Sequence, residues 1–363
     1  MPNQLQAQYQ HQLDNKISKL SDQLRPFNAP QLRVFPSPPE HYRMRAEFRV
    51  WHQDDDIYYI MFDHETGEKY RVDQLPAANQ LINQLMPQVL SFIKDKPSLR
   101  HRLFQVDFLT STTNQAVISL LYHRQLDDEW VHAATELQAH LCQYALVHVI
   151  GRARKQKIVL GEDAVIESLQ VLDKRYQFEQ VENSFTQPNA VVNESMLSWA
   201  KQVTTGFTGD LLELYCGNGN FSLPLADNFA RVLATEISKT SVRSAEHNIR
   251  LNGIENVTVV RLAAEEVTQA IQGVREFRRL EGVDLTAYDC QTVLVDPPRA
   301  GLDTATLEMI SQYQNILYIS CNPSTLTENL EYLTRTHRIE QAALFDQFPF
   351  TNHTEASVLL RKL

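Results

Sequence analysis

The chain has 363 residues, 43% of them hydrophobic, and this length suits two ordinary domains better than one core. Its formal net charge of −10 argues against a general polyanion binder, although a local basic patch can still bind nucleic acid. The four cysteines are scattered without a CxxC pair or zinc spacing, and neither a signal sequence nor the roughly 18 apolar residues of a membrane span is found, so we expect a reduced, cytoplasmic protein without a metal site.

The first half of the chain predicts helices mixed with antiparallel strands. Apolar residues recur at helical spacing over residues 5–24, 77–94 and 128–146. Strand-like alternation covers residues 41–72, with a polar turn at residues 54–56 and another near Gly67, and returns over residues 103–123. This mixture predicts an α+β domain over residues 1–180.

The second half alternates short apolar runs with helical stretches. The runs are "DLLELYCG", "RVLATEI", "VTVVRL", "TVLVDPP" and "ILYIS". Such alternation is typical of a parallel, doubly wound sheet, whose ligands bind at the carboxyl ends of the strands. The expected fold class is therefore α/β, with a Rossmann-like domain over residues 181–363 following the α+β domain.

The first of these runs ends in a glycine-rich turn, "ELYCGNGNFSLPLA". Gly217 and Gly219 allow a tight turn and a close approach of a ligand to the backbone, and Glu213 places a carboxylate near the strand tip. Ser222 stands where a dinucleotide fingerprint has its third glycine, so a simple turn is the alternative. The next run ends at Glu236, where an acidic side chain can bind both hydroxyls of a ribose. Together these features favour a cofactor that contains adenosine.

The segment "TVLVDPPRAGL" narrows the choice of cofactor. Asp296 follows a buried strand, and the two prolines after it fix a non-helical path that directs its carboxylate. A proline-rich turn is the alternative explanation. An Asp-Pro-Pro segment after a glycine loop and an acidic strand end is the layout of S-adenosylmethionine-dependent methyltransferases. Arg299 stands where amine-directed members carry an aromatic residue, which argues against amine methylation.

Cys321 ends the apolar run "ILYIS". Thr325 and Glu328 form a capping-box pattern that predicts a helix start directly afterwards, and a thiol beside a helix N-terminus should have a lowered pKa. A thiolate suits methylation of carbon 5 of uracil, which becomes nucleophilic only after an enzyme group has added to carbon 6. The alternative is a buried, inert cysteine.

That reaction also needs a base, because the methylated adduct must lose the proton on carbon 5 before the thiolate can leave. Glu355 precedes the final predicted strand, and burial in a closing site would raise the pKa of its carboxyl group toward the working range. A solvated loop charge is the alternative for Glu355. His353 is interpreted as a positioning or incidental residue.

Several of these segments together resemble one family, the RNA uridine-5 methyltransferases. The matching text is "HYRMRAEFRVWH", "TNQAV", "QVENSFTQPNA", "ELYCGNGNFSL", "ATEIS", "DPPRAGLD", "ILYISCNPSTL" and "HTEASVLL", and it spans nearly the whole chain. The resemblance implies S-adenosyl-L-methionine as cofactor, the T-arm and T-loop of tRNA as partner, and 5-methyluridine formed through a covalent Cys–C6 adduct as product. Other RNAs with a T-loop-like fold are further expected partners.

The resemblance also implies roles for individual residues. It makes Cys321 the nucleophile and Glu355 the proton acceptor. It assigns five residues to the cofactor site: Gln187, Tyr215, Asn220, Glu236 and Asp296. From the residues alone, "TQPNA" around Gln187 indicates only a helix start with Asn189 as its cap.

The branch of the family follows from what the first part of the chain lacks. Ribosomal members typically add an OB-like module and a cysteine cluster for an iron–sulfur centre, whereas no cysteine precedes Cys142 and the first 40 residues look helical. We therefore expect the tRNA branch without an iron–sulfur cluster. A ribosomal RNA methyltransferase, a small-molecule or protein methyltransferase, and an RNA-binding or tRNA-folding protein with incidental catalysis remain alternatives. A NAD-dependent oxidoreductase is more distant, because Asp-Pro-Pro and the cysteine have no place in hydride transfer.

RNA binding should fall mainly to the first domain and the cleft. Candidate phosphate contacts are Arg43, Arg45, Arg49, Arg100, Arg102, Arg152, Arg154, Lys155 and Lys157, for which a solvated basic face is the alternative. Exposed aromatic residues such as Phe104 or Phe108 could stack on loop bases. The target base must leave the stack to meet Cys321, and unstacking costs on the order of a few kcal/mol.

Overall fold

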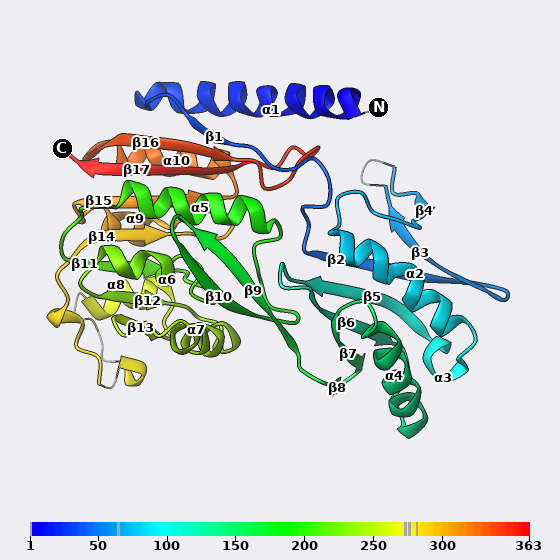
Figure 1. Cartoon of the computed structure of the whole chain (residues 1–363). Helices are drawn as coiled ribbons and strands as arrows, with labels where there is room; N and C mark the ends of the chain where they lie inside the picture. The colour runs from blue at the N-terminus through cyan, green and yellow to red at the C-terminus, as the bar shows by residue number, and fades with distance from the viewer. Residues whose placement is uncertain (1, 64–65, 272–273, 275–276, 281) are drawn as a thin grey trace.

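The computed structural model describes residues 2–63, 66–271, 274, 277–280 and 282–363. Two large sheets lie in different halves of the molecule, and a separate two-stranded hairpin lies between them (Figure 1). Across the described ranges, no helix combines the length and apolar character that a membrane crossing requires.

The first sheet has seven strands in the order β4-β3-β2-β5-β6-β7-β8. Only the β6–β7 pair is parallel. The strands are β2 (Arg45–Gln53), β3 (Asp56–Phe62), β4 (Lys69–Arg71), β5 (Leu103–Thr110), β6 (Gln115–Tyr122), β7 (Leu146–Ala153) and β8 (Gln156–Leu160). The helices α2 (Gln80–Lys94), α3 (Pro97–Arg100) and α4 (Asp128–Leu141) pack against it through one apolar core. The predicted helices and strands of this region are thus present.

The second sheet has eight strands in the order β1-β16-β17-β15-β14-β11-β12-β13. The five strands from β15 to the edge strand β13 run parallel, whereas β17 is antiparallel to both of its neighbours. The strands are β1 (Arg33–Phe35), β11 (Asp210–Leu214), β12 (Val232–Thr235), β13 (Val257–Val260), β14 (Cys290–Val295), β15 (Asn315–Ser320), β16 (His337–Phe345) and β17 (Glu355–Lys362). The chain changes direction across the sheet between β11 and β14, and ligands bind at such a switch point in doubly wound folds.

Helices cover both faces of the second sheet and enclose two apolar cores. They are α5 (Ala190–Val203), α6 (Ser222–Leu225), α7 (Lys239–Leu251), α8 (Ala264–Ile271), α9 (Thr304–Ile310) and α10 (Pro323–Leu333), with short 3-10 turns η1 (Arg25–Phe27), η2 (Ala226–Asn228), η3 (Arg278–Leu280) and η4 (Leu285–Ala287). The predicted doubly wound sheet with flanking helices is confirmed. Asn189 caps α5 as predicted, because its side chain accepts a hydrogen bond from the N–H of Val192.

Two segments expected in the first domain pack with the second sheet. Helix α1 (Pro2–Leu24) buries an apolar stripe in its core, and β1 pairs with β16 in parallel. The hairpin of β9 (Ala164–Val171) and β10 (Lys174–Val181) shares the other core with α5 and β11. The boundary between residues 180 and 181 therefore stays a prediction, and the hairpin just before it belongs to the packing of the second half.

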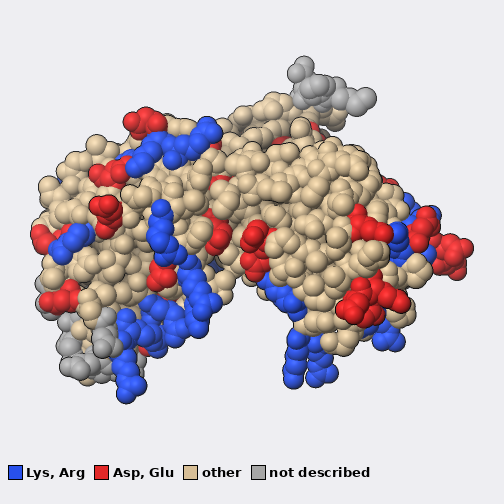
Figure 2. Space-filling model, turned by 60° about the horizontal axis from the view of Figure 1, so that its bottom comes forward, with Lys and Arg blue, Asp and Glu red and all other residues tan. Residues whose placement is uncertain are grey.

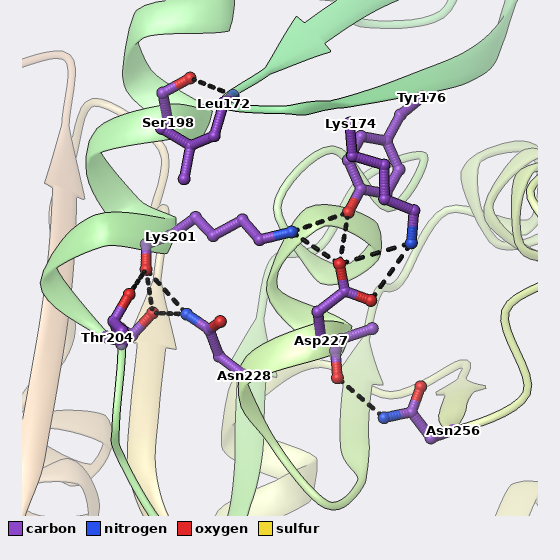
Figure 3. A network of polar contacts seen from close by, with 11 residues as sticks. Leu172, Lys174, Tyr176, Ser198, Lys201, Thr204, Asp227, Asn228 and Asn256 are labelled. Carbon is purple, nitrogen blue, oxygen red and sulfur yellow. Dashed lines mark hydrogen bonds and ion pairs between the residues drawn. The ribbon is translucent and has the colours of Figure 1, made fainter.

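A polar network fixes that hairpin (Figure 3). Asp227 on η2 accepts hydrogen bonds from Lys201 of α5 at 2.6 Å and from the hydroxyl of Tyr176 on β10 at 2.9 Å. Lys174 forms a further ion pair with the same carboxylate at 3.2 Å. The Lys201 side chain is only 9% exposed, whereas Asp227 and Lys174 are partly open to solvent, and these charge-assisted bonds tie the hairpin to the second sheet.

Candidate active site

Polar residues follow four neighbouring strands of the second sheet at one edge. Each comes directly after the last residue of its strand: Tyr215 after β11, Glu236 after β12, Asp296 after β14 and Cys321 after β15. In the ladder, Leu214 is paired with Thr235 on one side and with Val295 on the other. Tyr215, Glu236 and Asp296 are the next residues in each case, so they form a row along the carboxyl edge of the sheet.

Glu355 joins this edge from the opposite direction. It is the first residue of β17, which runs antiparallel to β15 with Ser320 paired to Ala356. One step further in the same register, Cys321 and Glu355 lie opposite each other. Side chains at directly opposed positions of antiparallel strands have Cβ atoms about 4.5–5.5 Å apart. The structure therefore brings together the predicted nucleophile and the predicted base.

The turn after Cys321 is held by its neighbours. The Ser320 hydroxyl accepts from the N–H of Asn322 at 3.1 Å, and the Asn322 side chain accepts from the N–H of Ser324 and donates to the carbonyl of Arg299. Helix α10 starts at Pro323 with Asn322 as its cap. The predicted capping box of Thr325 and Glu328 is therefore wrong. Asn followed by Pro offers both a side-chain acceptor and a residue without N–H, and so starts the helix earlier.

The pKa of the Cys321 thiol is raised, chiefly by burial and then by the negative charges of Glu355 and Asp296. The expectation that the helix N-terminus lowers it is wrong for the protein without its substrates. A helix terminus carries only about half a unit charge, whereas two carboxyl groups lie nearby. The positive charge of Arg299 acts in the lowering direction. The fraction of Cys321 that is ionised therefore depends on the balance between the positive charge of Arg299 and the negative charges of Glu355 and Asp296.

Glu355 and Asp296 form an interacting acidic pair, in which Glu355 is buried and Asp296 is partly exposed. Glu355 is 5% exposed, and burial together with the charge of Asp296 raises its pKa well above the usual range. Burial raises the pKa of Asp296 to about 7. The shift of Glu355 has the direction expected from the sequence. A carboxyl group with a raised pKa is a stronger base once ionised, which suits proton abstraction near neutral pH.

These shifts predict how activity depends on pH. Ionised Cys321 and ionised Glu355 are both needed, and the pKa values of both are raised, so kcat/KM should rise with pH through the neutral and mildly alkaline range. Asp296→Asn removes a negative charge and should move the rising limb to lower pH, whereas Arg299→Gln should move it to higher pH. Methyl transfer measured at constant ionic strength across this range checks both signs. If both substitutions moved the rise of kcat/KM in the same direction along the pH axis, this electrostatic explanation would be wrong.

A cavity of about 290 Å³ opens above Cys321. Its walls come from helix α1, from the loop after β14, from the turn and first residues of α10 and from the segment before β17: Lys16, Lys19, Leu20, Gln23, Arg299, Cys321, Asn322, Pro323, Ser324, Asn352, His353 and Thr354. The His353 ring lies 2.5 Å from the guanidinium of Arg299. The volume is at the lower end of the range for small-molecule sites, roughly 300–1,000 Å³, and suits one inserted group.

The glycine turn and the tip of β12 carry groups that suit adenosine. The Glu236 carboxylate accepts from the N–H groups of Gly217 at 3.1 Å and Ser238 at 2.7 Å. A carboxylate has about four acceptor positions, so two remain for ribose hydroxyls. Ile237 beside it is 65% exposed and offers an apolar face to a flat ring. Gly219 has φ of 85°, and a Cβ there would lie 2.5 Å from Leu223, so this turn requires glycine.

The remaining predicted cofactor residues differ in whether their side-chain polar atoms already have hydrogen-bond partners within the protein. Tyr215 adopts φ of 63°, and burial raises its pKa to about 12. The amide of Asn220 is paired in both directions with Asn193 at 2.9 Å, so its side chain faces α5. The Gln187 oxygen accepts from Gln347 at 2.9 Å, which links it to the segment before β17.

Glu213 is 1% exposed and accepts from the Ser222 hydroxyl, and burial raises its pKa to about 8. Ser222 at the position of the third glycine therefore bonds to a buried carboxyl group behind the turn. In the described ranges, no group of His, Cys, Asp or Glu side chains has an arrangement that could hold a metal ion.

The predicted RNA contacts comprise basic side chains and aromatic side chains. Arg152 and Lys157 are ion-paired with the nearly buried Glu182, at 2.5 Å and 3.6 Å, so their charge is largely used within the protein. Phe108 has no exposed surface and lies in the first core, so the suggestion that it stacks on bases is wrong. Phe104 is partly exposed and stacks on His123 with 3.9 Å between ring centroids. The β5–β6 register is irregular between Leu103 and Gln105, so Phe104 departs from the regular ladder that buries Phe108 four residues further on.

Arg299 and α1 are parts of the site that the residue pattern did not identify. The sequence suggested Arg299 only as the replacement for an aromatic residue, but its position directly after Asp-Pro-Pro at a strand end was a usable signal. No signal in the sequence connected α1 with the cavity, because that contact joins the two ends of the chain.

Fold and site together define a class: a Rossmann-like α/β protein with a glycine turn and an acidic strand end beside a thiol–carboxylate pair. The family model described as tRNA (Uracil-5-)-methyltransferase matches residues 8–363, and the chain belongs to that family. The expected resemblance and fold class are thereby confirmed.

Known proteins similar to this chain carry consistent names. A tRNA/tmRNA (uracil-C(5))-methyltransferase of Vibrio parahaemolyticus is 58% identical over 357 residues, which cover 98% of this chain and 97% of the relative. One of Proteus mirabilis is 57% identical over 364 residues, covering 100% of both. The crystal structure of Pyrococcus abyssi tRNA (uracil-54, C5)-methyltransferase in complex with S-adenosyl-L-homocysteine has a TM-score of 0.71 at 21% identity, covering 97% of this chain and 83% of that one, and supports the fold.

Proposed function

We propose that this protein methylates carbon 5 of a uridine in the T-loop of tRNA, with S-adenosyl-L-methionine as methyl donor, to give 5-methyluridine. The observation that carries the proposal is the register that sets Cys321 opposite Glu355 at the carboxyl edge of the sheet. The names of the relatives support tRNA and tmRNA as substrates, and we extend the proposal to other RNAs with a T-loop-like fold in the cytoplasm.

In this mechanism Cys321 and Glu355 divide the chemistry. The Cys321 thiolate adds to carbon 6 of the flipped uracil, and the electron pair of the 5,6 double bond moves toward the carbonyl at carbon 4. The cofactor, when bound, would supply the methyl group from its sulfonium to carbon 5, with the methyl–sulfur bond broken and the sulfur left as a neutral thioether. Glu355 takes the proton from carbon 5, the double bond forms again, and the thiolate leaves. Afterwards Glu355 passes its proton to solvent, and both groups return to their starting states.

We propose that Glu236 binds the ribose hydroxyls of the cofactor, because its carboxylate is already aimed by two backbone N–H groups. Asp296 and Tyr215 would lie along the neighbouring strand ends beside it. Gln187 would contribute through its amide nitrogen, since its oxygen is held by Gln347. Asn220 would contribute through its backbone or its remaining acceptor position, because its amide is paired with Asn193.

The RNA would lie across both halves of the protein. Figure 2 shows Lys and Arg side chains gathered on both sides of the hollow between the halves, which suits a phosphate backbone that follows the hollow. We propose that Arg49 and the Phe104–His123 stack contact the RNA loop, since the Arg49 guanidinium lies 5.5 Å from the Phe104 ring centroid on an exposed part of β5.

Incubation with an unmodified tRNA transcript and labelled S-adenosyl-L-methionine tests the function. Nucleoside mass spectrometry should detect one 5-methyluridine per tRNA, and a T-arm hairpin should also be methylated. A transcript whose T-loop target uridine is replaced by cytidine is the matched control and should stay unlabelled. Labelling of ribosomal RNA with no labelling of tRNA would contradict the proposed substrate.

A further inference from the structure

Helix α1 forms a wall of the cavity above Cys321. Four of its residues line the cavity: Lys16, Lys19, Leu20 and Gln23. They are spaced by three and four positions and therefore share one face of the helix. In Figure 1 the helix lies along the outside of the second sheet, beside β16, β17 and α10. The start of the chain thus contributes directly to the surroundings of the predicted nucleophile.

The position of this wall is fixed by buried contacts. Tyr9, Leu13 and Leu20 are each at most 4% exposed in the core of the second sheet. Lys16 interrupts this stripe, and its ammonium donates to Asp346 at 2.6 Å and to the carbonyl of Phe348 at 2.9 Å. These contacts join α1 to the segment that leads to Glu355, so the cavity has a firm rim on that side.

The basic side chains that line the cavity differ in whether neighbouring residues already hold them. The positive charge of Lys16 is offset by Asp346, whose side chain has no exposed surface. Arg299 lies against His353. Within the described part of the chain, the exposed Lys19 has no ion-pair partner, and it lines the same cavity as Cys321, which feels the charges of Glu355 and Asp296. A polyanion that approaches Cys321 is repelled by those two acids once they are ionised, so a cation at the mouth would favour its entry.

We propose that Lys19, together with the amide of Gln23, binds a backbone phosphate next to the target uridine. This inference rests on the proposed function, because a uridine that leaves its stack carries its two flanking phosphates to the cavity mouth. Lys and Gln side chains are common phosphate donors, and such contacts set the register of the nucleic acid without reading its bases. The two side chains lie one helical turn apart on the face that lines the cavity.

Binding and kinetics of Lys19→Gln on a T-arm hairpin test the contact. The variant should bind roughly tenfold more weakly, because a hydrogen bond to a charged group is lost. Its slope of log affinity against log salt should fall by about 0.7 to 1, as expected for one phosphate. KM should rise while kcat stays close to wild type, and Lys19→Arg should restore most of the affinity. Arg335→Gln, an equal charge change at the exposed end of α10, should leave all these values unchanged.

Hairpins with one neutral methylphosphonate linkage locate the phosphate. Neutralising a linkage adjacent to the target uridine should weaken wild-type binding by the same factor as Lys19→Gln and should have no further effect on the variant. A Lys19→Gln protein with wild-type affinity and salt slope, or one that loses affinity equally for every neutral linkage, would overturn the contact. Failure of the wild-type protein to methylate the unmodified hairpin would instead overturn the proposed function, since the binding measurements need no methyl transfer.

Discussion

Replacement of Cys321 by serine should lower turnover by at least about 10⁴-fold, in the range seen when other enzymes lose their nucleophile. A hydroxyl group ionises far less readily than a thiol, so carbon 6 of the base is left without an effective attacking group. We expect Cys321→Ser to retain S-adenosyl-L-methionine and RNA binding, because Cys321 lies outside the glycine turn and the β12 strand end that carries Glu236. Single-turnover transfer of labelled methyl to tRNA measures the loss.

Cys142→Ser is the matched control for this substitution. Cys142 is exposed at the end of α4 in the other half of the molecule, so its replacement should leave turnover within about twofold of wild type. If Cys321→Ser kept near-normal turnover while the control behaved as expected, the covalent mechanism would be wrong. A tRNA-folding assay with the Cys321 variant would then show whether a folding role persists without chemistry.

Replacement of Glu355 by glutamine should stop the reaction after methyl transfer. The amide is nearly the same size as the carboxyl group but cannot accept the carbon 5 proton, so the Cys321–RNA bond cannot break. A protein–RNA band that survives denaturation should accumulate to nearly one equivalent per enzyme, and steady-state turnover should fall by roughly 10²- to 10⁴-fold, the usual contribution of a general base. Mass spectrometry of the digested band should find a methylated uridine on the Cys321 peptide.

Glu328→Gln provides the matched change at an exposed position of α10, and it should turn over normally without a stable band. The double variant Glu355→Gln with Cys321→Ser should also form no band, which assigns the bond to sulfur. Normal turnover of Glu355→Gln would show that another group takes the proton.

The strand order near the site could be predicted from the sequence only in part. The ends of β11, β12, β14 and β15 were readable because each apolar run stops at a polar residue, and parallel strands bring such ends to one edge. The pairing of Cys321 with Glu355 could not be predicted from the sequence, because it depends on the insertion of β17 between β15 and β16 as an antiparallel strand. Chemistry suggested the two residues, and the ladder register supplies the geometry.

Other features escaped prediction because they arise from tertiary packing. The pKa of Cys321 is raised by burial of its own thiol and then by the charges of Glu355 and Asp296 beside it, and spacing along the chain does not reveal this. The pairing of Lys16 with Asp346 likewise joins residues from opposite ends of the chain. Phe104 and Phe108 look alike in the sequence, and only the packing of the first core distinguishes them.

The ion pair between Lys16 and Asp346 has a consequence for biosynthesis, because its members are separated by 330 residues. Ribosomes add about 5–20 residues per second, so α1 must wait roughly 15 to 65 seconds for the segment that completes its burial. The first sheet has all its strands between Arg45 and Leu160 and can assemble early. The segment that forms α1 therefore stays exposed during most of elongation. The walls of the cavity are complete only after the last part of the chain has left the ribosome.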